Sequence, residues 1–362
     1  MGRTDNIDLI INSIASKNTS VSLSGTFKSL NTLFKEAIER DPRILAFLGG
    51  YNGQYQSKYG FKTYNITITY NDDIPNRLDD VIVDDGTYSL HSLSKIEYPH
   101  KLYFVTDDMQ SFVNRMSQEF TDLFAYYEGM YGMEKSYFGF QDLSNKCAVI
   151  LTFNYGLEPM MLNSKMNQAH IKALQIANDL LKNQRVPDYV KVFLALSYIQ
   201  QETMYDHIAY NRIIQDASAI INDPMPSIAY GPLLENRGIC SGVSYAMKYL
   251  LDALNVENEL IFGALKGNDG KYVEHQWNLV KLGNFYYHVD ATYGIDQPVY
   301  VGSLFLHDNA MKEYRWDPTL FPKAIGRKYD YEEVEDWLVD HGEDLVDAGV
   351  DEKYVFPEHL FD

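Results

Sequence analysis

Long apolar runs and a basic leader segment are both missing from this 362-residue sequence. No hydrophobic run reaches the ~18 residues that a membrane-spanning helix needs, so membrane insertion is not expected. Residues 1–13 lack the basic stretch and the long apolar core of a signal peptide. Both absences predict a soluble chain that is not exported. The localisation stays open, because a secreted or cell-surface protein trimmed at its N-terminus would share these features.

Positive charge is also scarce. The sequence holds 31 Lys and Arg against 50 Asp and Glu, which gives a formal net charge of -19. A surface of this sign repels polyanions, so nucleic acid and acidic membranes are not expected as partners. With 46% hydrophobic residues, the chain can instead bury two cores, at the usual size of roughly 100 to 200 residues per domain.

Only two cysteines are present, Cys147 and Cys240, which is too few for a disulfide framework in a chain of this length. Cys147 begins the apolar run CAVILTF, which is typical of a strand. Cys240 lies in a turn between Gly238 and Gly242, directly ahead of a stretch with helical composition. This contrast makes Cys240 the candidate for a functional thiol.

An N-terminal α+β domain is expected over residues 1–160, built on a degenerate internal repeat. The first copy spans residues 29–72 and the second spans residues 109–156. Each copy contains a helical pattern followed by two strand patterns, with a turn rich in Gly and Tyr between them. The polar residues 75–100 between the copies are predicted to form a connector. Neither copy carries recognisable chemistry. The domain is a candidate for capping the second domain, presenting substrate or tethering, and a protein is the candidate partner for it.

Three further segments are predicted. Residues 161–186 are expected to form a connecting helix, because apolar residues recur there at steps of three and four. A second domain is expected over residues 187–328, in which helices precede three strands. Residues 329–362 form an acidic tail whose apolar residues have helix-like spacing, which predicts a docked helix. These apolar residues are Met166, Ala169, Ala173, Ile176 and Leu180 in the first segment, and Val334, Trp337, Leu338 and Leu345 in the tail.

A hairpin in the second domain brings two polar residues together. Gly283 and Asn284 are typical of a two-residue turn between strands. With that turn Trp277 pairs with Asp290, and residues two apart on one strand share a face. His275 and Asp290 are therefore predicted to be diagonal neighbours, at roughly 7 to 8 Å between backbone positions. An Asp that accepts a hydrogen bond from an imidazole leaves the other ring nitrogen free to take a proton.

The helix that follows Cys240 supplies the second part of a site. The unpaired N–H groups and the dipole of a helix N-terminus stabilise an adjacent anion, which favours a thiolate at such a position. Gly238 and Gly242 permit a sharp bend or a close approach of the backbone there. The residues therefore predict a nucleophile at a helix start that faces a base and its orienting carboxylate.

Three segments carry a resemblance to a known family, namely residues 236–242 (NRGICSG), 275–278 (HQWN) and 287–292 (YHVDAT). They resemble the three core motifs of bacterial transglutaminase-like proteins, which share the papain-like cysteine peptidase fold. With weaker matches such as Tyr205-Asp206, the resemblance covers roughly residues 187–325. The sequence departs from the family at Ser241-Gly242-Val243, where an acidic residue or Gln followed by Gly-Tyr is common, and at Gln276, where Ala is usual.

The resemblance implies an α+β fold with a papain-like or transglutaminase core, in which the helix bearing the cysteine packs on an antiparallel sheet bearing His and Asp. It implies Cys240 as nucleophile, His275 as base and Asp290 as the residue that orients the base. No cofactor is implied, and the expected substrate is a protein or peptide. Substrate or oxyanion contacts are expected from Tyr230, Ser241, Gly242 and Trp277.

The expected function is cysteine-dependent acyl transfer on protein or peptide amides. Water as the second nucleophile makes the protein a peptidase or amidase, which we favour, and a lysine amine makes it a transglutaminase. The alternative is a catalytically silent binding or scaffold protein that keeps the fold. Another reading is a zinc site formed by Cys240, His275, His288 and Asp290. Closely spaced ligand pairs are absent from the sequence, so no metal is expected.

Overall fold

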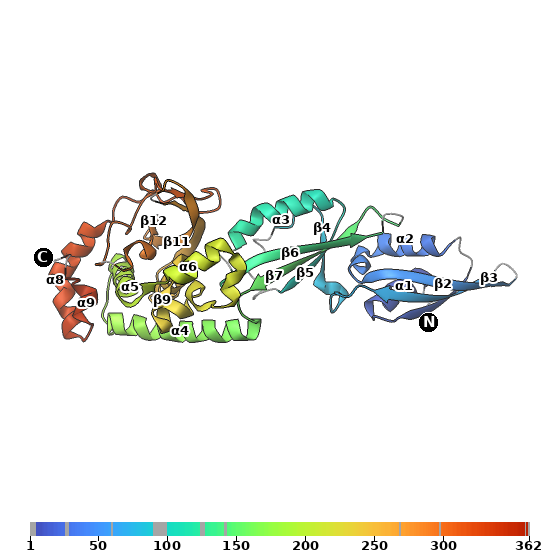
Figure 1. Cartoon of the computed structure of the whole chain (residues 1–362), viewed down its shortest axis with the longest axis horizontal. Coiled ribbons are helices and arrows are strands. Elements are labelled where there is room, and N and C mark those ends of the chain that lie inside the picture. Colours follow the sequence, from blue (N-terminus) through green and yellow to red (C-terminus); the bar gives the residue numbers. More distant parts are fainter. Residues whose placement is uncertain are drawn as a thin grey trace. The chain divides into compact units, whose positions relative to one another are not determined.

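The computed structural model describes residues 5–25, 29–58, 61–89, 100–123, 127–140, 143–267, 269–296, 298–358 and 360. Helices and strands are mixed along the chain, which confirms the predicted α+β class (Figure 1). The helices are α1 (Asn6–Ala15), α2 (Leu30–Arg40), α3 (Met109–Leu123), α4 (Pro159–Leu181), α5 (Asp188–Glu202), α6 (His207–Gln215), α7 (Cys240–Ala253), α8 (Tyr331–Asp347) and α9 (Glu352–Val355). Within the described part of the chain, no helix combines the length and the apolar character needed to cross a membrane.

The strands range from two to eleven residues in length. They are β1 (Ser20–Gly25), β2 (Leu48–Lys58), β3 (Phe61–Tyr70), β4 (Val81–Asp84), β5 (Lys101–Thr106), β6 (Met130–Gly139), β7 (Cys147–Tyr155), β8 (Met204–Tyr205), β9 (Arg237–Gly238), β10 (Asn258–Lys266), β11 (Tyr272–Leu282), β12 (Phe285–Val289) and β13 (Tyr314–Arg315).

The chain forms two compact units, and neither is continuous in sequence. Unit 1 comprises Met1–Phe120 and Met133–Asn154, and unit 2 comprises Thr121–Gly132 and Tyr155–Asp362. The segment Thr121–Gly132 thus belongs to unit 2 although it lies between two parts of unit 1. The domain limits at residues 160, 186 and 328 stay a prediction from the sequence.

Unit 1 begins with a three-stranded antiparallel sheet in the order β1-β3-β2, in which β2 and β3 form a long hairpin (Figure 1). Helix α2 starts at Ser29, whose hydroxyl accepts a hydrogen bond from the Thr32 N–H and so caps the helix. Phe34 of α2 stacks on Tyr51 of β2, with ring centroids 3.7 Å apart. The helices α1 and α2 also pack against each other, so their apolar faces share a core with the sheet.

A second sheet of unit 1 has the strand order β4-β5-β7-β6. Strand β4 pairs in parallel with β5, and β5 pairs antiparallel with β7. The prediction of a plain connector over residues 75–100 was therefore wrong for Val81–Asp84. The β-branched run Val81, Ile82 and Val83 finds a partner strand that the polar surroundings concealed in the sequence. Residues 90–99 of the predicted connector lie outside the described residues.

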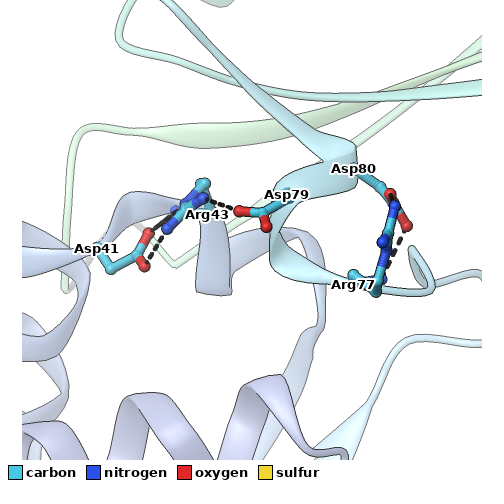
Figure 2. A network of polar contacts seen from close by, with 5 residues as sticks. All are labelled: Asp41, Arg43, Arg77, Asp79 and Asp80. Atoms are coloured by element: carbon cyan, nitrogen blue, oxygen red, sulfur yellow. Dashed lines mark hydrogen bonds and ion pairs between the residues drawn. The ribbon is translucent and has the colours of Figure 1, made fainter.

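A chain of charged groups precedes β4 (Figure 2). Arg43 donates two hydrogen bonds of 2.9 Å to the Asp41 carboxylate and a third of 2.9 Å to Asp79. Arg77 and Asp80 form a separate pair at 3.2 Å. The Arg43 contacts join the turn after α2 to the turn before β4, so they link the two sheets of unit 1.

Each copy of the predicted repeat holds the helix and two strands that its pattern indicates. Helix α2 precedes β2 and β3, and helix α3 precedes β6 and β7. The two copies nevertheless pair with different strands, because β3 adds β1 while β7 adds β5. The two copies therefore share the order of helix and strands along the chain, but they differ in how their strands pair within the sheets.

Unit 2 contains an antiparallel sheet in the order β12-β11-β10-β13, and α7 packs against β10 and β11. The predicted packing of the cysteine-bearing helix on an antiparallel sheet is thus confirmed. A second apolar cluster around Trp277 and Met311 also includes residues of β10 and β11. Helix α8 is capped by Asp330 and Glu333, and it buries Val334, Leu338 and Leu345, while Trp337 is partly buried.

The hairpin of β11 and β12 has the predicted register around its turn. Leu282 pairs with Phe285, Gly283 has a φ of 61°, and Asn278 pairs with Val289. The predicted second strand was wrong at its end, because β12 stops at Val289. Asp290 caps the short 3-10 helix Ala291–Gly294 by accepting a hydrogen bond from the Thr292 N–H at 3.0 Å. The acid that was expected in mid-strand therefore lies just beyond the strand.

Candidate active site

Cys240 is the first residue of α7, and the backbone around it is tightly packed. Its neighbour Ile239 is the N-cap residue, and the Ile239 N–H donates to the Pro226 carbonyl at 2.8 Å. A Cβ on Gly242 would lie only 2.3 Å from that carbonyl oxygen, so a larger residue does not fit there without movement. The Cys240 side chain is therefore held at the start of the helix, where unpaired N–H groups favour an anion.

The segment before Cys240 is anchored by an arginine. Arg237 of β9 donates hydrogen bonds to Asp223 at 2.6 and 2.9 Å, to Asp206 at 2.9 Å and to Glu235 at 2.9 Å. The hydrogen bonds with Asp223 are the largest cause of the raised pKa of Arg237. Strand β9 also pairs in parallel with β8, which fixes the approach to the cysteine from a second direction.

His275 of β11 and Asp290 form a buried pair, with 2.7 Å between Nε2 and Oδ2. His275 is 7% exposed and Asp290 is 1% exposed. The carboxylate is held on both oxygens, because the Tyr314 hydroxyl donates to Oδ2 at 2.8 Å and the Thr292 N–H donates to Oδ1 at 3.0 Å. The contact with Asp290 uses Nε2, so the Nδ1 atom of the imidazole is left for another partner.

The charges of this pair reinforce each other. Burial alone would lower the pKa of His275, but the Asp290 carboxylate outweighs burial and raises that pKa to about 10. A hydrogen bond and charge interaction with Cys240 act in the same direction. Burial would raise the pKa of Asp290, yet His275 holds it below its ordinary value. At neutral pH the pair is therefore an imidazolium and a carboxylate.

Trp277 supports His275 from the same strand. Its indole is fully buried and lies in near-parallel stacking with the His275 ring, at 6.0 Å between centroids. The Trp277 Nε1–H donates to His288 Nδ1 at 3.0 Å, and His288 Nε2 lies 3.0 Å from Asp308 Oδ1. Since Nδ1 accepts a hydrogen bond, Nε2 carries the proton and donates to Asp308. Trp277 is thus a core residue stacked against the His275 ring, and the substrate contact expected for it stays a prediction.

The geometry does not favour the zinc reading. Both ring nitrogens of His288 are engaged, one by Trp277 and the other by Asp308. Burial lowers the pKa of His288 in spite of the nearby Asp308 carboxylate, which fits a neutral ring. No group of three or more His, Cys, Asp or Glu side chains that could hold a metal ion occurs among the residues that the structure describes.

A cavity of about 150 Å³ lies in unit 2 beside the cysteine. Cys240, Ser241 and His275 line it together with Gln276 and Glu274. The remaining wall is mainly apolar or aromatic. It comes from the start of β6 and the residues before it, from helix α6 with the turn after it, from the segment before α7 and α7 itself, and from β10. These lining residues are Tyr127, Gly129, Met130, Tyr131, Tyr210, Ile213, Ile214, Ala217, Ser227, Ile239, Tyr245 and Phe262.

The other expected contact residues have different positions. Ser241 lines the cavity, as a substrate contact must. Gly242 instead faces the Pro226 and Ile228 carbonyls, so its role in the structure is close backbone packing. Tyr230 lies elsewhere, with the Lys165 ammonium 3.8 Å from its ring centroid. The roles of these residues toward a substrate stay predictions.

Two tyrosines near the pair were not predicted as site residues. Tyr314 lies in the two-residue strand β13, and no local pattern in the sequence marks it as the donor to Asp290. Tyr205 is part of a weak motif match, but no role was assigned to it. Burial raises the pKa of Tyr205, and Cys240 contributes to that rise through its charge, while a hydrogen bond with the Cys240 backbone opposes it. Tyr205 is thus a direct neighbour of the cysteine.

Similarity to known proteins is found among solved structures. No protein-family model matches the chain, and no curated protein matches it. Among solved structures, a TGase is similar at 13% identity and a TM-score of 0.30, covering 75% of this chain and 79% of its own. A candidate cysteine protease from Cytophaga hutchinsonii has 13% identity and a TM-score of 0.27, covering 45% of this chain and 63% of its own.

A candidate protease from Parabacteroides distasonis has 11% identity and a TM-score of 0.26, covering 74% of this chain and 39% of its own. The chain spans less than two thirds of the two protease chains. At these TM-scores the similarity says nothing about the reaction. What the protein does has to be inferred from the site itself.

Proposed function

We propose that this protein carries out cysteine-dependent acyl transfer on protein or peptide amides, with Cys240, His275 and Asp290 as its catalytic triad. One observation carries the proposal. The imidazole of the buried 2.7 Å pair between His275 and Asp290 lines the same cavity as the Cys240 thiol. A nucleophile, a base and a group that orients the base are what covalent acyl transfer requires.

In the proposed reaction Cys240 attacks the carbonyl carbon of the amide as a thiolate, while its proton resides on His275. A carbon–sulfur bond forms while the carbonyl π electrons move to oxygen, and N–H groups in the first turn of α7 stabilise this oxyanion. The His275 imidazolium then gives its proton to the leaving amine, the carbon–nitrogen bond breaks, and a thioester remains. Water then gives a proton to the neutral His275 while its oxygen attacks the thioester carbon. The carbon–sulfur bond breaks, which releases the acid and restores the Cys240 thiolate beside the imidazolium.

Hydrolysis is the outcome we favour, so the proposed activity is that of a peptidase or amidase. Transamidation follows the same steps with a lysine amine in place of water. The resemblance of the three sequence motifs to bacterial transglutaminase-like proteins supports the hydrolytic outcome. The mass of the released product separates the two reactions, because transamidation joins the acyl group to the amine.

A second candidate function is a catalytically silent binding protein that retains the fold. One observation favours it, namely that the Cys240 residue is only 9% exposed. A thiol that reagents cannot reach would have no turnover, however well its imidazole is oriented. Reactivity of the thiol therefore separates the two candidates.

Iodoacetamide labelling at neutral pH tests the proposal, with Cys147 as an internal comparison. Burial raises the pKa of Cys147, and its thiol lies 3.8 Å from the Thr106 carbonyl oxygen, so slow labelling is expected there. Fast labelling of Cys240 that is lost in His275→Ala and kept in Cys147→Ala would support the enzyme. Labelling of Cys240 no faster than a small free thiol would contradict it.

A second experiment identifies the reaction. The protein is mixed with a panel of peptide amides and the intact mass is followed, with Cys240→Ala as the matched control. An acyl adduct on the wild-type protein that is absent from Cys240→Ala is the expected result. Turnover that persists in Cys240→Ala would rule out the proposed nucleophile.

A further inference from the structure

Two polar side chains in the cavity wall have atoms without a hydrogen-bond partner. They are the Gln276 Nε2 amide and the Ser227 Oγ hydroxyl, and both atoms are buried. Gln276 is 2% exposed and Ser227 is 4% exposed. A buried polar group that lacks a partner costs roughly 1–3 kcal/mol, so such groups in a native protein call for an explanation.

Both residues are rigidly placed around the cysteine. The Gln276 carbonyl accepts a hydrogen bond from the Ser244 hydroxyl of α7 at 2.7 Å, and Gln276 pairs with Phe262 across the sheet. Ser227 belongs to the segment that contacts Gly242 in the first turn of α7. The backbone at both positions is therefore held against the first turns of α7.

The size and polarity of the cavity limit what it can accept. About 150 Å³ is the size of a cavity that binds one benzene-sized group, and it is well below the roughly 300–1,000 Å³ of a site for a whole ligand. The described lining residues include no Lys or Arg, and their one acidic residue is the exposed Glu274. Apart from Glu274 and the paired His275 the wall is mainly apolar, so a charged side chain would lose its hydration there and an uncharged one is favoured.

We propose that this cavity is a subsite for one large uncharged side chain of a peptide substrate, with Gln276 and Ser227 as specificity-determining residues. Gln276 Nε2 donates to a backbone carbonyl oxygen of the bound peptide, and the Ser227 hydroxyl takes a second polar group of that backbone. The inference rests on the proposed function of the triad and adds its substrate class. That class comprises peptides with a leucine-sized or aromatic residue next to the reacting carbonyl.

Peptide chloromethyl ketones test this inference, since the Cys240 sulfur displaces chloride and leaves a stable thioether. The probes carry Leu, Phe, Ala, Glu or Lys, varied in separate series at the residue bearing the ketone and at the residue before it. Each rate of Cys240 labelling is divided by the iodoacetamide rate of the same protein. The ratio isolates recognition of the peptide from the reactivity of the thiol.

The wild-type protein is expected to prefer Leu and Phe over Ala, Glu and Lys by at least about tenfold in one series. Gln276→Met keeps the volume but removes the donor, and about tenfold slower normalised labelling by the Leu probe is expected. Ser227→Ala is expected to slow it about threefold. The matched control is Tyr331→Phe, which removes a buried hydroxyl without a partner from α8 and should leave the ratios unchanged.

The possible outcomes distinguish failure of the subsite inference from failure of the proposed function. A fast wild-type Cys240 with equal ratios for all five side chains, or with ratios that Gln276→Met leaves unchanged, would overturn the inference alone. A wild-type Cys240 that reacts no faster than a free thiol with iodoacetamide would overturn the proposed function and the inference with it. Melting temperatures identify variants whose normalised labelling rates change merely because the protein unfolds.

Discussion

At the scale of single residues, the charge of one carboxylate determines the state of the imidazole. Asp290 is almost fully buried, and its oxygens accept hydrogen bonds from Tyr314 and Thr292 besides contacting His275. These donors keep the carboxylate in place and ionised. The orientation of His275 and its proton affinity therefore depend on the same group.

Replacing Asp290 by Asn should lower the pKa of His275 sharply. Without the carboxylate, burial lowers the pKa of the imidazole and the interactions with Cys240 are left to raise it, so the pKa should fall well below about 10. In NMR spectra of ¹⁵N-histidine-labelled protein, assigned through His275→Gln, the wild-type ring should be doubly protonated at pH 8 and the Asp290→Asn ring neutral. Tyr314→Phe is the control, since it removes a donor and keeps the charge. A neutral ring in the wild type at pH 8 would refute the ion pair.

The same shift gives a pH dependence of stability. The folded pKa of about 10 lies above the ordinary 6.5, so the contribution of His275 is fully present below about pH 6.5 and is lost as the pH rises toward 10. The free energy of unfolding of the wild type relative to His275→Gln should therefore fall between pH 7 and pH 10. Urea unfolding at four pH values measures it, and a constant difference would contradict the raised pKa.

Glu128 is a second buried acid, and it lies outside the proposed chemistry. Burial raises its pKa to about 7, while hydrogen bonds from the Tyr249 hydroxyl and the Ala229 N–H oppose the rise. The Tyr249 oxygen is 2.6 Å away. Glu128 thus connects the segment before β6 to Tyr249 of α7 and to Ala229. Its sequence neighbours Tyr127 and Gly129 line the cavity.

Glu128→Gln should change how stability depends on pH. The native pKa of about 7 exceeds the ordinary 4.5, so this acid stabilises the fold below about pH 4.5 and loses that contribution as the pH rises to 7. The neutral amide has no such slope. Relative to wild type, the variant should therefore gain up to about 3 kcal/mol between pH 5 and pH 8, at ~1.4 kcal/mol per pKa unit. Urea unfolding of both proteins at pH 5 and pH 8 measures this gain. An equal difference in stability between wild type and Glu128→Gln at both pH values would contradict the prediction.

At the scale of elements, the start of α7 depends on close backbone approach. A Cβ on Gly242 would lie 2.3 Å from the Pro226 oxygen and 3.0 Å from the Ile228 oxygen, and neither backbone group can rotate away. The segment that holds Ser227 therefore has to shift if this glycine is replaced. Both the cysteine and the cavity wall would move with it.

Gly242→Ala should destabilise the protein by about 1–3 kcal/mol, as overpacking usually does. It should also slow the labelling of Cys240, because the helix start is displaced from His275. Ser241→Ala in the same turn is the matched control, and a change within about 0.5 kcal/mol is expected for it. Urea unfolding and iodoacetamide rates measure both effects. Equal stability of the two variants would show that the turn has room for a methyl group.

The sequence predicts elements where the signal is local. Gly283 and Asn284 define the turn, and the register of β11 and β12 follows from it. The end of β12 could not be predicted, because it depends on Asp290 turning back to the Thr292 N–H. Strand β4 could not be predicted either, because its partner β5 begins some twenty residues later in the chain.

The parts of the site that depend on segments far apart in the chain could not be predicted from a single sequence either. Tyr314 reaches Asp290 only because β13 pairs with β10, and two residues of strand carry no pattern of their own. Glu128 looked like part of a Gly and Tyr turn in the repeat. Its burial depends on partners 101 and 121 residues away, which no local period can indicate.

At the scale of the whole molecule, the two units divide the sequence unequally. Thr121–Gly132 belongs to unit 2, and its residues Tyr127 and Met130 are each 4% exposed and line the cavity. A cut placed after unit 1, at residue 155, would therefore remove part of the wall beside the cysteine. The unit that holds the site is not the same as the C-terminal half of the chain.

A shortened chain of residues 156–362 should be less stable than one of residues 121–362. Loss of two buried side chains, Tyr127 and Met130, costs at least about 3 kcal/mol at ~1.5–3 kcal/mol each, and loss of Glu128 adds to it. Thermal melting of the two chains and of the full protein measures the difference. Equal melting temperatures would show that the segment contributes nothing to unit 2.

The position of Glu128 also bears on how the protein is made. A ribosome that adds roughly 5–20 residues per second completes Glu128 on the order of ten seconds before Tyr249, 121 residues later, exists. During that interval α7 does not yet cover the carboxylate, so the burial that raises its pKa to about 7 is still incomplete. Glu128, which lies between the cavity-lining residues Tyr127 and Gly129 in the sequence, is thus translated early and covered late.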